Sequence, residues 1–183
     1  MKFATVVSLW VVTAAVTAKA EEPKSGSKVR LEMAGIRTAF SATRIDEHFY
    51  QAEAYARWAL PGQLEFGRDW SLRAGIDASA GMLGRLSKED KGFVGSLGPV
   101  LILNCARIPV DLVIGSSPTI LSRDSFDGVD LGVPFQFTSH LGFNVHLSDR
   151  WSLSYRLQHM SNAGMGDRNP GLDLHSLALS FKF

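Results

Sequence analysis

The sequence has little cysteine and no strong imbalance of charge, and each absence excludes a class of protein. Cys105 is the single cysteine among 183 residues, so the chain can form no internal disulfide and holds no cysteine cluster for zinc or redox chemistry. The 19 Lys and Arg residues nearly balance the 18 Asp and Glu residues, which leaves a formal net charge of +1. A strongly basic nucleic-acid-binding protein and an acidic disordered tail are both excluded.

Long apolar runs are lacking beyond the N-terminus. The uncharged stretch 92–106 contains three glycines and Pro99, which make it a poor helix, so no transmembrane helix is predicted after residue 20. In residues 1–20, a positive charge precedes an apolar segment that ends at the small-x-small site Ala18-Lys19-Ala20. This pattern predicts a cleaved signal peptide, with a membrane anchor or a core helix as the alternative. We expect one domain over residues 21–183.

The hydrophobic pattern of that domain repeats every two residues, which is typical of β-strands with one apolar and one polar face. The clearest segments are 50–60, 70–80, 133–147, 151–161 and 177–183, and weaker ones lie at about 29–38, 93–104 and 110–120. The sequence therefore predicts an all-β protein of eight strands.

The predicted connections alternate between long polar loops and short turns, which is the layout of an outer-membrane barrel. The long loops are 39–48, 82–92, 121–131 and 162–171, and the short turns are 61–69, 105–109 and 148–150, with Pro61-Gly62 as one turn signal. Five aromatic residues on the apolar face gather at the short-turn rim: Trp58, Trp70, Trp151, Phe181 and Phe183. An interfacial aromatic girdle belongs at such a rim, whereas a soluble sandwich or lipocalin-like barrel has no reason to collect aromatics at one level.

We therefore predict an eight-stranded antiparallel transmembrane β-barrel in the bacterial outer membrane, with both termini on the periplasmic side. Eight strands leave room only for side chains, so the polar faces fill the interior and form no pore. Buried charges must be paired, which favours a structural network over ion transport. The charged residues expected in this network are Glu53, Arg57, Arg73, Asp77, Asp111 and Arg156.

Three polar residues interrupt the outward apolar face near the long-loop rim. His159 and Ser161 continue the apolar parity of 151–157, and Asp173 shares the outward parity of the last strand. Residues i and i+2 lie about 6.6–6.8 Å apart on one face, so the His159 ring can reach the Ser161 hydroxyl while Asp173 accepts from the other ring nitrogen. This arrangement suits nucleophilic acyl transfer.

The alternative is a wet rim at which isolated polar residues have no function. His175 is a rival base on the outward face, but it is deeper and farther from Ser161. His140 and His146 are on the inward parity and are expected to be structural.

The segment His159-Met160-Ser161-Asn162-Ala163-Gly164, followed by Asn169-Pro170-Gly171, resembles the signature of the lipid A 3-O-deacylases, the PagL family. The resemblance implies an outer-membrane barrel in which Ser161 is the nucleophile and His159 its general base. Asp173 stands where the family usually has Glu, and it is one methylene shorter. Asn162 would contribute to the oxyanion hole through its backbone N–H, with Gly164 permitting the turn.

The same resemblance implies hydrolysis of the 3-position acyl ester of lipid A in lipopolysaccharide, in contact with outer-membrane lipids, with no metal or other cofactor. Cationic loop residues would hold the lipid A phosphates, with ordinary solvated loop charge as the alternative: Arg44, Lys88, Lys91, Arg123 and Arg168. A homodimer is left open, and no nucleic-acid partner is expected. The competing functions are a non-enzymatic structural or surface-defence barrel and a different lipid-active barrel, such as a phospholipase or an acyltransferase.

Overall fold

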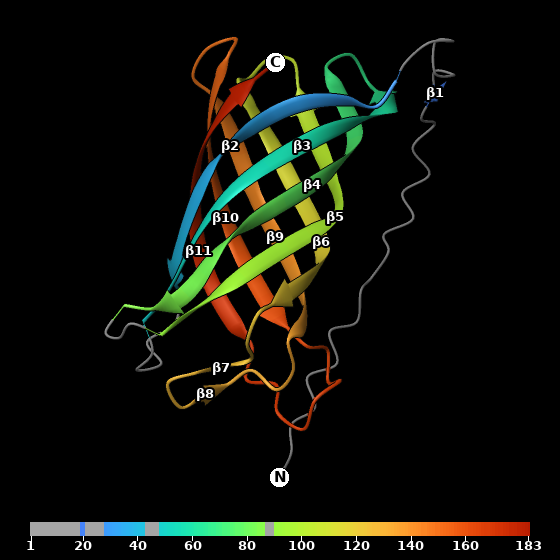
Figure 1. The fold of residues 1–183 in the computed structure, drawn as a ribbon. Coiled ribbons are helices and arrows are strands. Elements are labelled where there is room, and N and C mark those ends of the chain that lie inside the picture. Colours follow the sequence, from blue (N-terminus) through green and yellow to red (C-terminus); the bar gives the residue numbers. More distant parts are fainter. Residues whose placement is uncertain (1–18, 21–27, 43–47, 87–89) are drawn as a thin grey trace.

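Eight long antiparallel strands form a closed barrel in the computed structural model, which describes residues 19–20, 28–42, 48–86 and 90–183 (Figure 1). They follow the order β3-β2-β11-β10-β9-β6-β5-β4, and the pairing of β3 with β4 closes the ring. The strands are β2 (Arg30–Ser41), β3 (Phe49–Phe66), β4 (Trp70–Arg85), β5 (Lys91–Cys105), β6 (Val110–Leu121), β9 (Phe135–His146), β10 (Trp151–Ser161) and β11 (Leu172–Lys182). The predicted eight-stranded antiparallel barrel is confirmed.

Three further strands have two residues each. β1 (Lys19–Ala20) pairs with β3, while β7 (Ser125–Phe126) and β8 (Val129–Asp130) form a small hairpin. Residues 1–18 of the predicted signal peptide, and the predicted domain start at residue 21, lie outside the described residues. Within the described ranges, no helix is long and apolar enough to cross a membrane.

The connections divide between the two ends of the barrel (Figure 1). The last residues of β2, β4, β6 and β10 and the first residues of β3, β5, β9 and β11 lie at one end, here called the loop end. The connections from β3 to β4, β5 to β6 and β9 to β10 and the C-terminal Phe183 gather at the opposite end, here called the turn end. This is the alternation of long and short connections that the sequence predicts.

The alternating pattern separates an apolar outer wall from a polar interior. Along β10, the inward residues Ser152, Ser154 and Arg156 are buried, whereas Trp151 and Leu153 on the opposite parity are exposed. The same alternation runs along β9 and β11. An exposed apolar wall that surrounds a buried polar interior is the reverse of a soluble barrel, and it suits hydrocarbon as the surrounding medium.

Paired charges fill the centre of the interior. Arg57 Nε and Nη2 donate to the two carboxylate oxygens of Asp77 at 2.6 and 3.0 Å, and Arg156 Nη1 approaches the same carboxylate at 3.2 Å. Each of the six residues predicted for this network is in an ion pair, but the pairs form separate groups: Glu53 pairs with Arg37, and Arg73 contacts both Glu32 and Asp111. The partners Arg37 and Glu32 were not predicted, because their strand is only weakly periodic.

An apolar cluster fills the interior at the loop end and supports the strand ends there. Phe49 and Phe126 meet edge to face at 5.7 Å between ring centroids, which places the β7–β8 hairpin over this cluster. Met160 and Leu174 are among the cluster's fully buried members. Since these two residues are the chain neighbours of His159 and Asp173, their burial helps to turn His159 and Asp173 outward.

Two predicted details are wrong. Pro61-Gly62 is not a turn, because β3 continues through it to Phe66. The register shifts between Ala59 and Gln63, and Gly62 has a φ of 88°, so the two residues form a bulge in which the missing proline N–H is tolerated. As a result, Trp58 lies within β3 instead of at its end. The predicted loop 121–131 also contains the β7–β8 hairpin, whose turn residues Asp127 and Gly128 both have positive φ.

Neutralising Asp77 should destabilise the barrel more than any surface charge does. Asp77→Asn leaves Arg57 and Arg156 without their shared counter-charge, and we expect the free energy of unfolding to fall by about 3–5 kcal/mol. Urea unfolding in detergent, followed by tryptophan fluorescence, measures the change. The matched control is Arg107→Ala, which removes the exposed 2.8 Å pair with Asp69 and should cost about 1 kcal/mol or less. Equal effects of the two substitutions would contradict the structural role of the network.

Candidate active site

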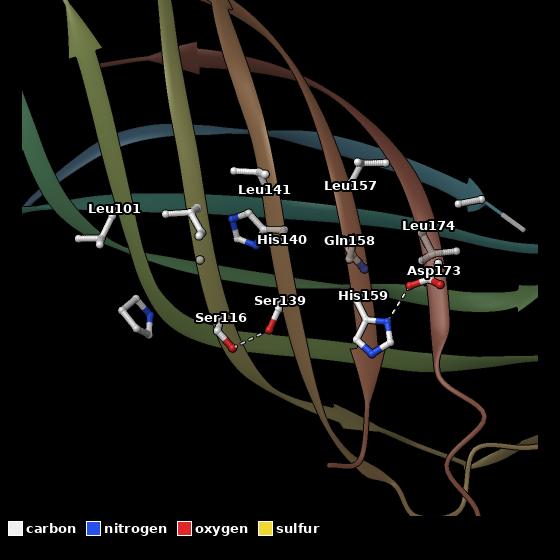
Figure 2. A pocket seen from close by; sticks show the side chains of 14 residues that line it. Leu101, Ser116, Ser139, His140, Leu141, Leu157, Gln158, His159, Asp173 and Leu174 are labelled. Carbon is white, nitrogen blue, oxygen red and sulfur yellow. Dashed lines mark hydrogen bonds and ion pairs between the residues drawn. The ribbon is translucent and has the colours of Figure 1, made fainter. Parts of the chain in front are cut away.

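A carboxylate–imidazole pair lies on the outer wall near the loop end (Figure 2). His159 on β10 and Asp173 on β11 are directly opposite in the ladder, and His159 Nδ1 lies 2.6 Å from Asp173 Oδ1. Because an ionised carboxylate can only accept, Nδ1 carries a proton and donates it, so that in the neutral ring Nε2 is an acceptor. The two side chains are 55% and 50% exposed, so a molecule at the outer wall can reach them.

Ser161 is the last residue of β10 and shares the outward face of His159. Nε2 of His159 points away from Asp173, toward the end of β10 at which Ser161 lies (Figure 2). Among the described residues, no hydrogen bond joins the Ser161 hydroxyl to the imidazole, and the structure brings together two of the three predicted groups. A long separation is common in free enzymes, in which the contact tightens only when substrate binds.

Gly171 fixes the space around the imidazole. Its φ of 72° lies in the left-handed region, and a Cβ added there would be 3.1 Å from His159 Cε1. A side chain at this position would therefore be strained and would press on the ring. Gly171 belongs to the Asn-Pro-Gly segment noted in the sequence, but only the folded loop shows its contact with His159.

Asn162 anchors the chain directly after Ser161. Its side chain is fully buried, and Nδ2 donates to the carbonyl oxygens of Leu131 at 3.0 Å and Arg168 at 2.6 Å. Its Oδ1 accepts from Gly164 N–H at 2.9 Å, and its own N–H donates to Asn169 Oδ1 at 3.1 Å. Both predicted oxyanion donors thus have acceptors within the loop, so their roles stay predictions that require these bonds to be exchanged for a bond to substrate.

The other histidines lie where the sequence places them. His175 faces outward, one position deeper than His159, and hydrogen-bonds Tyr155 through Nδ1 at 2.6 Å. His140 and His146 point inward, and His146 bonds Asp111 and Ser152, each at 3.1 Å. None of these three rings contacts Ser161 or Asp173 in the described part of the chain.

An apolar groove of about 890 Å³ runs across the outer wall from the imidazole–carboxylate pair (Figure 2). His159 and Asp173 line one end, and its apolar lining includes Pro99, Leu101, Ile114, Leu141 and Leu157. The β5–β6 ladder is interrupted beside the groove, between Ser96 and Val100. Pro99 has no backbone N–H with which to continue the ladder.

Two serines also line this groove, and no sequence pattern assigned them a role. Ser139 is the ladder partner of His159 on β9, and Ser116 is the partner of Ser139 on β6. Their hydroxyl oxygens lie 3.0 Å apart, and both side chains are exposed (Figure 2). Both serines lie on the outward face of their strands, which the period-two pattern fills mainly with apolar residues.

The loop cations predicted to bind phosphates differ in their surroundings. Arg123 is paired with Asp90, and Arg168 lies 3.6 Å from Asp130 with 70% of its side chain exposed. Lys91 is exposed at the start of β5, while Arg44 and Lys88 lie outside the described residues. In the described ranges, no group of three or more His, Cys, Asp or Glu side chains could hold a metal ion. Cys105 is buried at the end of β5, and its role stays open.

The fold and the site together define a membrane β-barrel that carries an acid–imidazole pair on its lipid-facing wall. The family described as lipid A 3-O-deacylase (PagL) matches residues 48–182, and the chain belongs to this family. That range contains His159, Asp173 and every other residue that lines the groove except Ala42.

Comparison with individual proteins gives one relative by sequence and two solved structures that share the fold. Over 69 residues the chain is 36% identical to the lipid A deacylase PagL of Bordetella bronchiseptica, and the matched stretch covers 38% of this chain and 39% of that protein. The crystal structure of the outer membrane enzyme PagL superposes with a TM-score of 0.66 at 19% identity, covering 80% of this chain and 97% of that one. The N-terminal β-barrel domain of Pseudomonas aeruginosa OprF gives a TM-score of 0.50 at 10% identity, covering 85% and 100%. The chain is an outer-membrane protein, as its apolar wall requires.

Removing the carboxylate should change the imidazole tautomer. In the native chain, His159 should carry its proton on Nδ1, whereas in Asp173→Asn the amide can donate to Nδ1 and favour the Nε2–H form. The ¹⁵N chemical shifts of the labelled ring in detergent micelles distinguish the two forms. Asp167→Asn, in the exposed loop after β10, should leave the spectrum unchanged. The same tautomer in native protein and Asp173→Asn would remove Asp173 from its orienting role.

Proposed function

We propose that this protein hydrolyses the 3-O-linked acyl ester of lipid A in lipopolysaccharide, with Ser161 as nucleophile, His159 as general base and Asp173 as the orienting acid. One observation carries the proposal: the 2.6 Å pair between His159 and Asp173 faces lipid in a chain that belongs to the lipid A 3-O-deacylase family. A pair inside the barrel would be out of reach of the substrate, and a pair exposed to solvent would lie away from the membrane that holds the substrate.

The reaction uses the free ring nitrogen. His159 Nε2 takes the hydroxyl proton of Ser161 as Oγ attacks the ester carbonyl, and the imidazolium that forms is stabilised by Asp173. As the tetrahedral intermediate collapses, His159 returns the proton to the departing sugar oxygen. Water then repeats the sequence on the acyl-enzyme, releasing the fatty acid and restoring Ser161.

Asp173 can replace the longer glutamate of the family because of its place in the ladder. It is directly opposite His159, where cross-strand Cβ atoms are about 4.5–5.5 Å apart. A short side chain spans that gap, and the bond of 2.6 Å is short, as hydrogen bonds to an ionised acceptor are.

The oxyanion would be held by loop N–H groups. Asn162 and Gly164 remain our candidates, and both lie just past the nucleophile. For either to act, its present acceptor, Asn169 Oδ1 or Asn162 Oδ1, must give way to the substrate oxygen. The strong anchoring of Asn162 to two carbonyl groups keeps Ser161 at a fixed position while this exchange occurs.

Lipid A would approach from the outer leaflet with its sugar at the loop end, which we place on the extracellular side. The acyl chain would lie in the apolar groove beside His159, against Leu141 and Leu157. Arg168 is exposed, and its ion pair with Asp130 is long. It is therefore the described loop cation best placed to meet a phosphate. A homodimer stays a prediction.

Loss of the nucleophile tests the mechanism. We expect native protein in outer membranes to remove the 3-linked chain from lipid A, and Ser161→Ala to lower that conversion by a factor of about 10³ or more. Mass spectrometry of lipid A measures the conversion, and Ser125→Ala on the exposed β7 hairpin is the matched serine control.

The outcomes separate the competing functions. Equal deacylation by native protein and Ser161→Ala would overturn the mechanism, and no acyl loss in either would favour a structural or surface-defence barrel. Cleavage of glycerophospholipids, or acyl transfer in place of hydrolysis, would favour a different lipid-active barrel.

The groove can be tested by filling it. Leu141→Trp places a large ring where we seat the acyl chain, so KM for a long-chain ester should rise severalfold while short-chain esters are affected less. Leu97→Trp on β5 is the control, because Leu97 is equally exposed on the outer wall (59% against 56%) but does not line the groove. Equal kinetic changes in both variants would show that the acyl chain does not occupy this groove.

A further inference from the structure

The ladder register builds a polar row across the outer wall that extends beyond the acid–imidazole pair. Asp173, His159, Ser139 and Ser116 are successive ladder partners on β11, β10, β9 and β6. All four face outward and line the same groove. The chemistry described above uses the first two members of this row and leaves the two serines without a role.

An apolar row runs beside the polar one, one outward position deeper in the wall. Leu157, Leu141, Ile114 and Leu101 are likewise successive partners, on β10, β9, β6 and β5. Figure 2 shows Leu101, Leu141 and Leu157 along one side of the groove and Ser116, Ser139 and His159 along the other. A chain that starts at His159 and follows the groove therefore meets hydrocarbon on one side and two hydroxyl groups on the other.

Two hydroxyl groups on a lipid-facing wall are expensive without hydrogen-bond partners. Ser116 and Ser139 bond each other at 3.0 Å, which satisfies one of their two donors. One O–H donor and several lone pairs remain, and hydrocarbon can satisfy none of them. A ligand group that both donates and accepts would complete the pair, and an alcohol is the simplest such group.

We propose that Ser139 and Ser116 form a subsite for a hydroxyl group carried by the acyl chain of the substrate, close to its ester. The inference rests on the proposed ester hydrolysis and adds a determinant of substrate specificity to it. Ser139 is the diagonal cross-strand neighbour of the nucleophile Ser161, about 7–8 Å away, so the recognised hydroxyl belongs to the first few carbons of the chain.

The position of the serines favours the acyl chain over the headgroup as the source of the hydroxyl. Phe137 is the ladder partner of Ser161, and Pro118 is the partner of Phe137. These two apolar residues lie between the serines and the loop end, where the sugar would sit. A sugar hydroxyl would have to pass them, whereas a chain seated in the groove already lies against Ser139.

The test compares two synthetic glucosamine 3-O-esters of equal chain length, one with a hydroxyl on the third carbon of the chain and one without. Native protein should prefer the hydroxylated ester in kcat/KM by about fivefold, the effect of one net hydrogen bond. The double variant Ser116→Ala/Ser139→Ala should bring that ratio close to one. Ser125→Ala should keep the native ratio, and a merely structural role of the serines would change both esters equally.

Each outcome decides between the proposals. If native protein cleaves neither ester, the proposed hydrolysis is wrong and the subsite falls with it. If native protein cleaves both esters equally, or if the double variant keeps the native preference, the subsite is wrong and the hydrolysis stands. If the double variant loses both activities to the level of Ser161→Ala, the serines belong to the hydrolytic machinery and do not select the acyl chain.

Discussion

Every backbone N–H and C=O that faces hydrocarbon must find its partner within the protein, and the rest of this structure depends on that requirement. The barrel meets it by pairing each long strand on both sides and closing the ring between β3 and β4. Closure fixes the register of all eight ladders together, and a shift by one residue would exchange the inner and outer faces of a strand. The positions of His159, Ser161 and Asp173 on the outer wall are therefore set by the whole barrel as well as by their own strands.

Interior chemistry secures that register. Arg57 and Arg156 share the carboxylate of Asp77, so a strand that slipped would leave a charge unpaired in a closed interior. At the loop end, the apolar cluster replaces this network and holds Met160 and Leu174 inward. The outer wall can then carry polar groups near the rim, because the free energy that stabilises the fold comes from the interior.

The sequence allowed the strands and their faces to be predicted because period-two alternation is a local signal. It also allowed the pairing of His159 with Asp173 to be predicted, since the two lie on consecutive strands joined by one loop. Contacts that depend on distant strands could not be predicted. The pairing of Ser139 with Ser116 depends on the register across the β7–β8 insertion. The bulge at Pro61-Gly62 has the same composition as a turn, and only the continuing ladder with β4 distinguishes them. The contact of Gly171 with the His159 ring depends on the loop conformation.

Placing the site on the wall solves a problem of access. The ester of a membrane lipid cannot enter an interior filled with paired charges, and the interface where its sugar meets its acyl chains lies at one depth of the leaflet. The outward row from Asp173 to Ser116 crosses four strands near the loop end, and Leu157, Leu141 and Ile114 lie one outward position farther from that end. A substrate can therefore reach the nucleophile by lateral diffusion alone, and its acyl chain exchanges lipid neighbours for the groove at little cost. Polar residues on this wall must then be few and must complete one another's hydrogen bonds, which the acid–imidazole pair and the serine pair each do in part, so that each pair keeps a polar atom free for a substrate.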